Sequence, residues 1–297
     1  MDLSSAPWRR ERPGDSPGMP AWSMPGRGYR NEPVPAEVLT GVDHDWAWRG
    51  AEGQGVRVCV LDSGVDGQHP LVGPVERSWE IVTPGSGPPT AVECADGDLA
   101  GHGTACAGIV RAIAPQASLY SVKVLGDGKS GSGAALIAGL DHAIEQGFDV
   151  INVSLSTARP EFRDQLARLC DRAYFRRCLL VVAAHNLPVE SFPWAFSSVI
   201  SVASHAEPDP MRFYYNATPP VDLYARGVRV PVARPGGGTA RNTGNSFAAP
   251  HIAGIVALVL SKHPWLTPFQ LKTVLYQCAA NVLTRGAKNG VLVTRTT

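Results

Sequence analysis

The chain has 297 residues, 44% of them hydrophobic, and its 27 basic and 26 acidic residues leave a formal net charge of +1. This length and composition are those of a globular enzyme domain with a sizeable core. The balanced charge gives no reason to expect a nucleic acid or an anionic membrane as a partner. No apolar run reaches the length of a membrane-spanning helix.

The beginning of the chain differs in composition from the rest. Residues 1–35 are rich in proline and show little apolar periodicity, so we predict an extended or disordered arm there. Its tryptophans, Trp8 and Trp22, could dock on the domain or on a partner protein. The first residues also lack the apolar core of a secretory signal, which predicts a cytoplasmic location unless a signal has been removed by processing.

Apolar periodicity predicts strands and helices that alternate along the chain. Such alternation implies a mainly parallel sheet with helices on both faces, which is a three-layer α/β fold. The predicted segments are strands at 56–61, 119–124, 150–155, 179–183 and 199–203, and helices at 105–111, 134–146, 161–177, 246–260 and 265–280, with a glycine- and serine-rich loop at 126–133.

Ser246 stands at the expected start of the most apolar helix of the chain. Its segment reads Thr243-Gly244-Asn245-Ser246-Phe247-Ala248-Ala249-Pro250-His251, followed by an unbroken apolar run. A helix N-terminus offers free N–H groups and the positive end of a dipole, and both favour negative charge that develops beside the serine. The pattern therefore fits a nucleophile, although a serine there could also be a simple helix cap.

Two upstream segments supply a base and an orienting acid. Asp62 ends the first predicted strand, and His102 opens a helix of small residues. A serine hydroxyl needs a base within hydrogen-bond reach, and histidine suits that role near neutral pH. An aspartate would hold one histidine tautomer and stabilise the imidazolium. Taken singly, these residues fit a turn and a cap; together with Ser246 they predict an Asp-His-Ser triad.

With these segments assembled, the chain resembles the subtilisin-like serine proteases (subtilases, peptidase S8 type). The resemblance runs from about residue 35 to 283, which predicts a catalytic domain at 36–283 and a tail at 284–297. It implies the three-layer subtilisin-like fold and peptide-bond hydrolysis through an acyl-enzyme. The stretches that carry it are 55–66, 101–108, 119–125, 138–144, 149–156 and 243–251.

The resemblance also assigns residues beyond the triad. Asn186 follows an apolar strand and is expected to be the oxyanion-hole donor, together with the Ser246 N–H. Two segments resemble the edges that hold an extended substrate. The expected substrate-binding residues are Gly131, Ser132 and Gly133 on one side, Ser154, Leu155 and Ser156 on the other, and Ala184 and His185 before the oxyanion asparagine.

Two of these positions depart from the family pattern. His185 and Ser156 stand where the family usually has glycine. A side chain at His185 could narrow the primary pocket or alter the backbone beside the oxyanion hole, especially if that backbone had a positive φ. The Ser156 hydroxyl could restrict the pocket or donate to the substrate, or the exchange could be harmless.

No metal and no cofactor are expected. Many subtilases insert a calcium-binding loop after the histidine helix, whereas here residues 108–115 run directly on to Ala114-Pro115. We interpret the acidic Asp96-Gly97-Asp98 as a solvated turn. The six cysteines show no metal-ligand spacing, which predicts reduced thiols and again a cytoplasmic protein.

These observations lead to one main hypothesis and two alternatives. The main hypothesis is a serine endopeptidase, and the compact chain suggests a dedicated role in cleaving the leader of an intracellular precursor peptide. The first alternative is a macrocyclase or transpeptidase that passes the same acyl group to an amine. The second is a degenerate protease that only binds peptides or serves as the subunit of a partner protein.

Overall fold

The computed structural model describes residues 41–85, 87–95, 97–126 and 131–282, together with the backbone of 284–285 and 292–293. The predicted arm at 1–35 and most of the predicted tail at 284–297 lie outside the described residues. So do residues 127–130 of the glycine- and serine-rich loop. The predicted domain boundaries therefore stay predictions.

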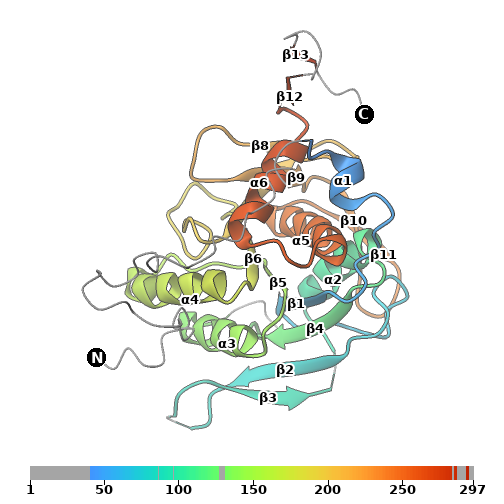
Figure 1. Ribbon diagram of the computed structural model, residues 1–297. Coiled ribbons are helices and arrows are strands. Elements are labelled where there is room, and N and C mark those ends of the chain that lie inside the picture. The colour runs from blue at the N-terminus through green and yellow to red at the C-terminus, as the bar shows by residue number, and fades with distance from the viewer. Residues whose placement is uncertain are drawn as a thin grey trace, which may run out of the picture.

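A nine-stranded sheet forms the centre of the molecule (Figure 1), in the order β3-β2-β4-β1-β5-β6-β7-β9-β8. All neighbouring pairs are parallel except the two edge pairs, β2–β3 and β8–β9. The strands are β1 (Arg57–Asp62), β2 (Arg77–Val82), β3 (Thr90–Cys94), β4 (Ser118–Lys123), β5 (Val150–Val153), β6 (Leu179–Ala183), β7 (Ile200–His205), β8 (Tyr214–Tyr215) and β9 (Leu223–Arg226).

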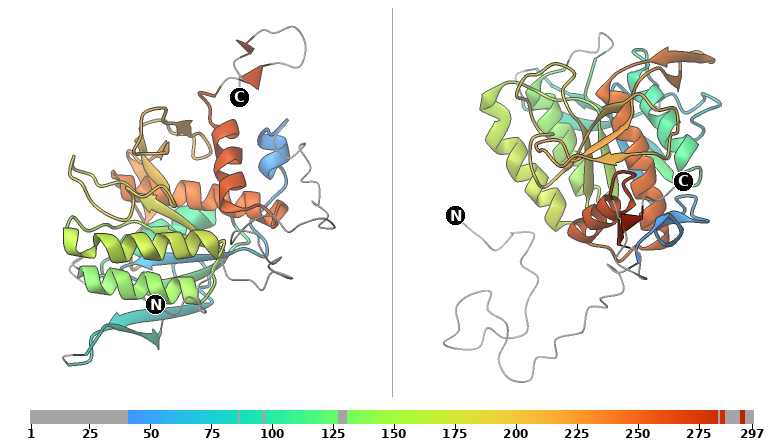
Figure 2. Two further views of the ribbon diagram at one scale, coloured as in Figure 1. Left: turned by 60° about the vertical axis from the view of Figure 1, so that its left-hand side comes forward. Right: turned by 90° about the horizontal axis from the view of Figure 1, so that it is seen from above.

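Helices cover both faces of this sheet (Figures 1 and 2). On one face lie α1 (His44–Trp48), α2 (His102–Ile113), α5 (Asn245–Lys262) and α6 (Pro268–Cys278). On the other lie α3 (Gly133–Glu145) and α4 (Arg163–Phe175), the latter preceded by a 3-10 turn at Pro160–Phe162. The predicted three-layer α/β fold is therefore confirmed.

Strand β1 shows why the sheet is buried on both sides. Val58 and Val60 point into the core under α2 and α5, whereas Cys59 and Leu61 point into the core under α3 and α4. Successive side chains of a strand face opposite sides, so a sheet between two helical layers needs a continuous apolar run. Such a strand carries the first candidate residue, Asp62, to its carboxyl end.

The structure adjusts several predicted boundaries. The helix predicted at 105–111 begins three residues earlier, at His102, because Gly101 adopts a φ of 76° that turns the chain into it. The helix predicted at 161–177 opens as a 3-10 turn and ends at Phe175. The last helix is shorter than predicted, and the reciprocal capping box of Thr267 and Gln270 sets its start.

Several short elements were not predicted. They are α1, the two outermost strands at each side of the sheet (β3 and β2, β9 and β8), and the hairpin of β10 (Val230–Ala233) and β11 (Thr239–Asn242). Most are brief, and β3 and β11 are largely exposed, so they carry little apolar periodicity. A strand suggested at 291–293 corresponds to β13 (Leu292–Val293), which pairs with β12 (Thr284–Arg285). Among the described helices, none is both long and apolar enough to cross a membrane.

Candidate active site

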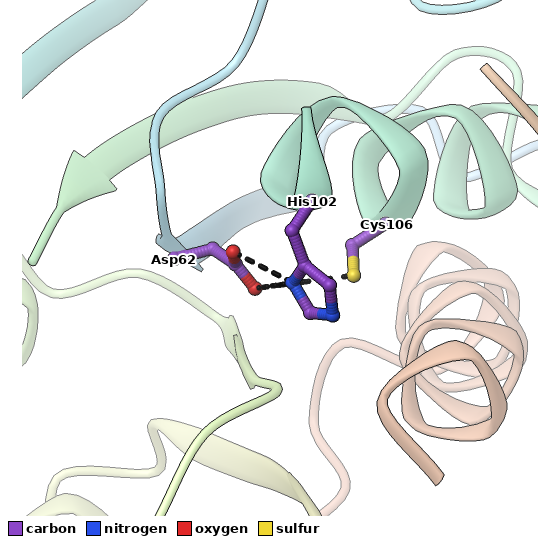
Figure 3. A group of neighbouring side chains, drawn as sticks. All are labelled: Asp62, His102 and Cys106. Carbon is purple, nitrogen blue, oxygen red and sulfur yellow. Dashed lines mark hydrogen bonds and ion pairs between the residues drawn. The ribbon is translucent and has the colours of Figure 1, made fainter. Parts of the chain in front are cut away.

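Asp62 and His102 come together where β1 ends and α2 begins. The buried carboxylate of Asp62 accepts from Nδ1 of His102, at 2.8 Å through Oδ1 and 2.9 Å through Oδ2 (Figure 3). A carboxylate only accepts, so the Nδ1 hydrogen points to Asp62 and Nε2 is left for the opposite side of the ring. This is the orientation that a general base needs.

Gly103 explains how α2 approaches β1 so closely. A Cβ atom at this position would clash with the Gly64 carbonyl oxygen and lie 3.1 Å from the Asp62 Cβ. Any larger residue would push the first turn of α2 away from the end of β1. The glycine after His102 is therefore part of what places the imidazole on the carboxylate.

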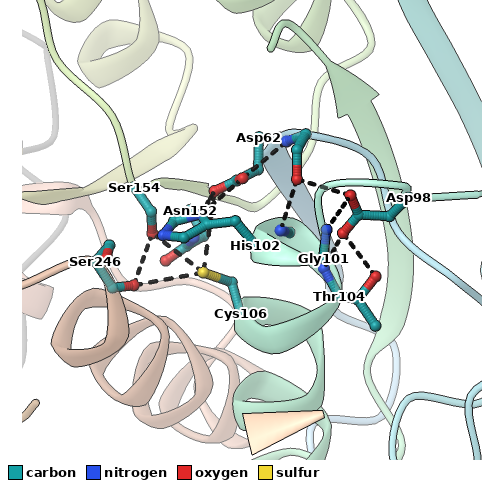
Figure 4. A network of polar contacts seen from close by, with 11 residues as sticks. Asp62, Asp98, Gly101, His102, Thr104, Cys106, Asn152, Ser154 and Ser246 are labelled. Atoms are coloured by element: carbon teal, nitrogen blue, oxygen red, sulfur yellow. Dashed lines mark hydrogen bonds and ion pairs between the residues drawn. The ribbon is translucent and has the colours of Figure 1, made fainter. Parts of the chain in front are cut away.

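Ser246 lies in the first turn of α5, as predicted. Its carbonyl oxygen accepts hydrogen bonds from Ser154 Oγ at 3.0 Å and Cys106 Sγ at 3.4 Å (Figure 4). The ring of the next residue, Phe247, lies 5.3 Å from the His102 ring, measured between centroids. These contacts bring the start of α5 to the same end of the sheet as Asp62 and His102.

Asn186 follows β6 and is clamped against the start of α5. Its Oδ1 accepts from the Asn245 backbone N–H at 2.9 Å, and the Asn245 amide donates to the carbonyls of Ala184 and His185. A Cβ atom placed on Gly244 would lie 3.3 Å from Ser246 Oγ and 3.6 Å from Asn186 Nδ2, so the hydroxyl and the amide meet above Gly244. This clamp leaves Nδ2 as the donor available to the cleft.

A cleft of about 590 Å³ opens in front of these groups. His102, Asn186 and Ser246 line it, while the fully buried Asp62 lies behind the imidazole. All eight residues that the sequence predicted as substrate walls line the same cleft: Gly131, Ser132, Gly133, Ser154, Leu155, Ser156, Ala184 and His185. The structure thus gathers every predicted site residue in one place, and their individual roles stay predictions.

Comparison with known proteins identifies the family of this chain. A model of the subtilase family matches residues 53–293. The chain belongs to the subtilase family. Its relatives include Subtilisin E of Bacillus subtilis, 32% identical over 246 residues that cover 78% of this chain, and the Major intracellular serine protease of the same organism, 34% identical over 235 residues that cover 73% of this chain and 71% of that protein.

Solved structures agree on the fold of this subtilase. Sphericase superposes with a TM-score of 0.66 at 26% identity, and the matched region covers 79% of this chain and 86% of the Sphericase chain. A cold-adapted subtilisin-like serine proteinase superposes with a TM-score of 0.61 at 26% identity, and the matched region covers 83% of this chain and 88% of the proteinase chain. The match spans only 62% of the full length of Subtilisin E.

The two unusual wall residues of this subtilase are held by neighbours. His185 Nδ1 accepts from the Leu187 N–H at 3.0 Å, and among the described residues only Arg177 and Arg229 combine a positive φ with a side chain, so His185 does not sit in a strained backbone. Ser156 Oγ lies 3.0 Å from Ser191 Oγ, which is fully buried.

Ser191 connects Ser156 to Trp194. It accepts from Trp194 Nε1 at 2.8 Å, so its own hydroxyl hydrogen is available to Ser156. The backbones of Thr157 and Phe192 exchange two hydrogen bonds of 2.9 Å beside it. Ser191 could not be predicted as a partner of Ser156, because it lies 35 residues later in the chain and has no motif of its own.

Asp98 corrects an expectation. The sequence suggested a solvated turn, but the side chain is only 7% exposed and accepts from Ser63 Oγ, Gly101 N, Thr104 N and Thr104 Oγ1 at 2.7–2.9 Å (Figure 4). The carboxylate caps the N-terminus of α2, where free N–H groups and the helix dipole favour a negative charge. The sequence signal that could have predicted this cap is an acidic residue a few positions before His102, the first residue of α2.

Cys106 completes one possible metal cluster. Ligand atoms of Asp62, His102 and Cys106 lie within 4.8 Å of one another, the only such group of three within the described part of the chain (Figure 3). Burial, and then the charge of Asp62, raise the pKa of the Cys106 thiol well above its usual value. The thiol therefore stays protonated and donates to its neighbours, whereas a metal would need the thiolate and would occupy the Asp62 and His102 atoms that face each other. The expectation that no calcium binds after α2 stays a prediction.

Proposed function

We propose that this subtilase is a serine endopeptidase that cleaves peptide bonds through an acyl-enzyme. The observation that carries the proposal is the bond between His102 Nδ1 and the buried Asp62 carboxylate, in a cleft that Ser246 also lines. Ser246 Oγ attacks the scissile carbonyl while His102 Nε2 takes its proton. Asp62 keeps the imidazole oriented and stabilises its positive charge. His102 then returns the proton to the leaving amine, and water repeats the sequence to release the acid.

The oxyanion of the tetrahedral intermediate is held by Asn186 Nδ2 and the Ser246 N–H. Support comes from the fixed amide of Asn186, whose Oδ1 is already used by Asn245. The Ser246 N–H lies in the first turn of α5, where backbone donors have no partner within the helix. One such donor lowers the barrier by roughly 3–4 kcal/mol.

The substrate lies extended between the segments 131–133 and 154–156. Edge segments of this kind hold a peptide by main-chain hydrogen bonds and read alternate side chains in pockets. The Ser156–Ser191–Trp194 chain of hydrogen bonds fixes the Ser156 hydroxyl in the wall of the cleft that Ser246 also lines. We therefore assign a small or medium side chain to the residue before the scissile bond.

The finer role is intracellular processing of a precursor peptide. In support, none of the six cysteines, all of which lie in described residues, forms a disulfide. A relative of 34% identity is named Major intracellular serine protease. A wall carrying Ser156 and His185 also favours a narrow range of substrates over general digestion.

The test is active-site labelling followed by digestion of a defined peptide library. We expect a fluorophosphonate probe to label the parent protein and Ser197→Ala, an exposed loop variant, but not Ser246→Ala. Mass spectrometry of the library then gives the cleavage sites, and a product lighter by one water would instead reveal cyclisation. An unlabelled parent protein with no cleavage would contradict the proposal and favour a peptide-binding role.

A further inference from the structure

A second cleft, of about 410 Å³, is lined by residues of α2 and β10, among others. None of its lining residues is shared with the cleft at Ser246. Its walls are mainly apolar and include Leu71, Ile109, Ile113, Val230 and Val232. The volume falls within the range of roughly 300–1,000 Å³ that is typical of ligand sites.

The two arginines that line this cleft differ in their partners. Arg111 uses its guanidinium for the fold: Nε donates to the Val72 carbonyl, and Nη1 donates to the carbonyls of Pro115 and Ala117. Arg226, the last residue of β9, makes no side-chain hydrogen bond or ion pair with any described residue, and its Nε is buried. A buried donor without a partner is costly, so Arg226 lacks an acceptor that a ligand would supply.

His251, in α5, presents the complementary group. It is 2% exposed, and its Nδ1 lies 2.8 Å from the Phe247 carbonyl, which can only accept. Burial lowers the pKa of His251 to about 4, and the charge of Arg226 contributes to this lowering. The neutral ring therefore carries its hydrogen on Nδ1, and Nε2 is an acceptor with no hydrogen-bond partner in the described chain.

The cleft thus combines an unpaired cation, an unpaired acceptor and an apolar wall. A ligand that satisfies all three carries an anionic acceptor next to an N–H donor, together with an apolar side chain. The last residue of a peptide has this arrangement, because its carboxylate and its N–H are attached to the same Cα. A fatty acid supplies an anion but no neighbouring donor, and a free phosphate has no apolar side chain for the walls.

We propose that this cleft binds the C-terminal residue of an apolar peptide, with its carboxylate on Arg226, its N–H on His251 Nε2 and its side chain against the apolar walls. Such a ligand touches α2 and α5, the helices that begin at His102 and Asn245. Binding to the folded state alone also raises the temperature of unfolding.

The experiment measures peptide binding by calorimetry with the full chain carrying Ser246→Ala, so that no probe is cleaved. The probes are N-acetyl-Val-Leu with a free carboxylate, the same dipeptide as its C-terminal amide, and octanoate. The added variants are Arg226→Gln, Arg226→Lys and, as a matched control, Arg168→Gln on the exposed side of α4.

We expect Arg226→Gln to weaken binding of the free dipeptide by about tenfold or more, the loss of a charge-assisted hydrogen bond. Arg226→Lys should bind with intermediate affinity, and Arg168→Gln should bind like the parent. The amide, which has no carboxylate for Arg226, should bind weakly to the parent and equally weakly to Arg226→Gln.

Equal binding of the free dipeptide by the parent and Arg226→Gln would overturn the proposal, because the probe would then occupy another site. Absence of binding, or octanoate binding as tightly as the dipeptide, would overturn it too. Since Ser246→Ala removes the nucleophile, none of these outcomes depends on the proposed protease activity.

Discussion

The hydroxyl of Ser63 donates a 2.9 Å hydrogen bond to the buried carboxylate of Asp98, and this bond joins the end of β1 to the start of α2. The same hydroxyl accepts from the Gly103 N–H at 3.0 Å, while Asp98 accepts from Gly101 and Thr104. Because Ser63 follows Asp62 and Gly103 follows His102, this network sets the distance between the acid and the imidazole. Asp98 is therefore a positioning residue for the pair.

Replacing Asp98 tests that role. The substitution Asp98→Asn removes the charge and one acceptor atom, so the N-terminal turn of α2 loses bonds that are individually worth roughly 1.5–3 kcal/mol. We expect kcat to fall by about tenfold or more, KM to change little, and the pH dependence of kcat to shift as the Asp62–His102 contact loosens. Steady-state kinetics across pH measure this, with the exposed Asp164→Asn as the control. A wild-type pH profile in Asp98→Asn would show that the network only supports the fold.

Asn186 is expected to stabilise the oxyanion through Nδ2 while Oδ1 holds Asn245. Asn186→Asp keeps an acceptor for the Asn245 N–H but has no donor for the oxyanion. We expect kcat to fall by roughly 10²–10³-fold with a small change in KM. The melting temperature should stay close to that of the parent, whereas Asn186→Ala should lower both quantities. Unchanged kcat in Asn186→Asp would remove Asn186 from the proposed mechanism.

Ser156 is expected to limit the side chain before the scissile bond. Ser156→Gly removes the hydroxymethyl group in front of Ser191 and deepens the wall at that point. We expect the ratio of kcat/KM for a phenylalanine substrate over an alanine substrate to rise by about tenfold, the usual effect of a small change in pocket size. Paired peptides that differ only at this residue give the ratio, and Ser197→Gly is the matched control. A ratio that does not move would place the limiting contact elsewhere in the cleft.

His251 gives the folded protein a defined acid sensitivity. Its pKa drops from an ordinary 6.5 to about 4, so between these values the unfolded chain binds a proton that the folded chain does not. The free energy of unfolding contributed by this group is therefore fully present above pH 6.5 and declines as the pH falls towards 4, by about 3 kcal/mol at most. Burial also lowers the pKa of His142 and of His263, so these two groups contribute to the acid sensitivity with the same sign.

Denaturant unfolding at several pH values measures this contribution. We expect His251→Gln to flatten the decline between pH 6.5 and 4, the ordinary and the lowered pKa of His251. The exposed Ser197→Ala, which changes no titratable group, should leave the slope unchanged. An equal slope in the parent and His251→Gln would show that other groups, such as His142, His263 and the carboxylates, cause the acid sensitivity.

Local sequence was enough to predict the five central strands of the sheet, its helical layers and the residues of the candidate triad. Val58, Val60 and Leu61 mark β1 by their unbroken apolar character, and Ser246 precedes an apolar run long enough for a buried helix. These features depend on neighbours within a few residues, which is the range over which periodicity and capping act. Short, exposed elements such as β3 lack that periodicity and were missed.

Contacts between distant segments were decided only by the tertiary structure. The sequence around Asp98 does not predict the hydrogen bond from Ser63, and the sequence around Ser156 does not predict its contact with Ser191. The meeting of Arg226 and His251 in a second cleft likewise depends on how β9 and α5 pack. The sequence by itself determined which residues are candidates for the chemistry, because motifs are local. Only the folded chain decided which buried polar groups find partners, because that depends on packing between elements far apart in sequence.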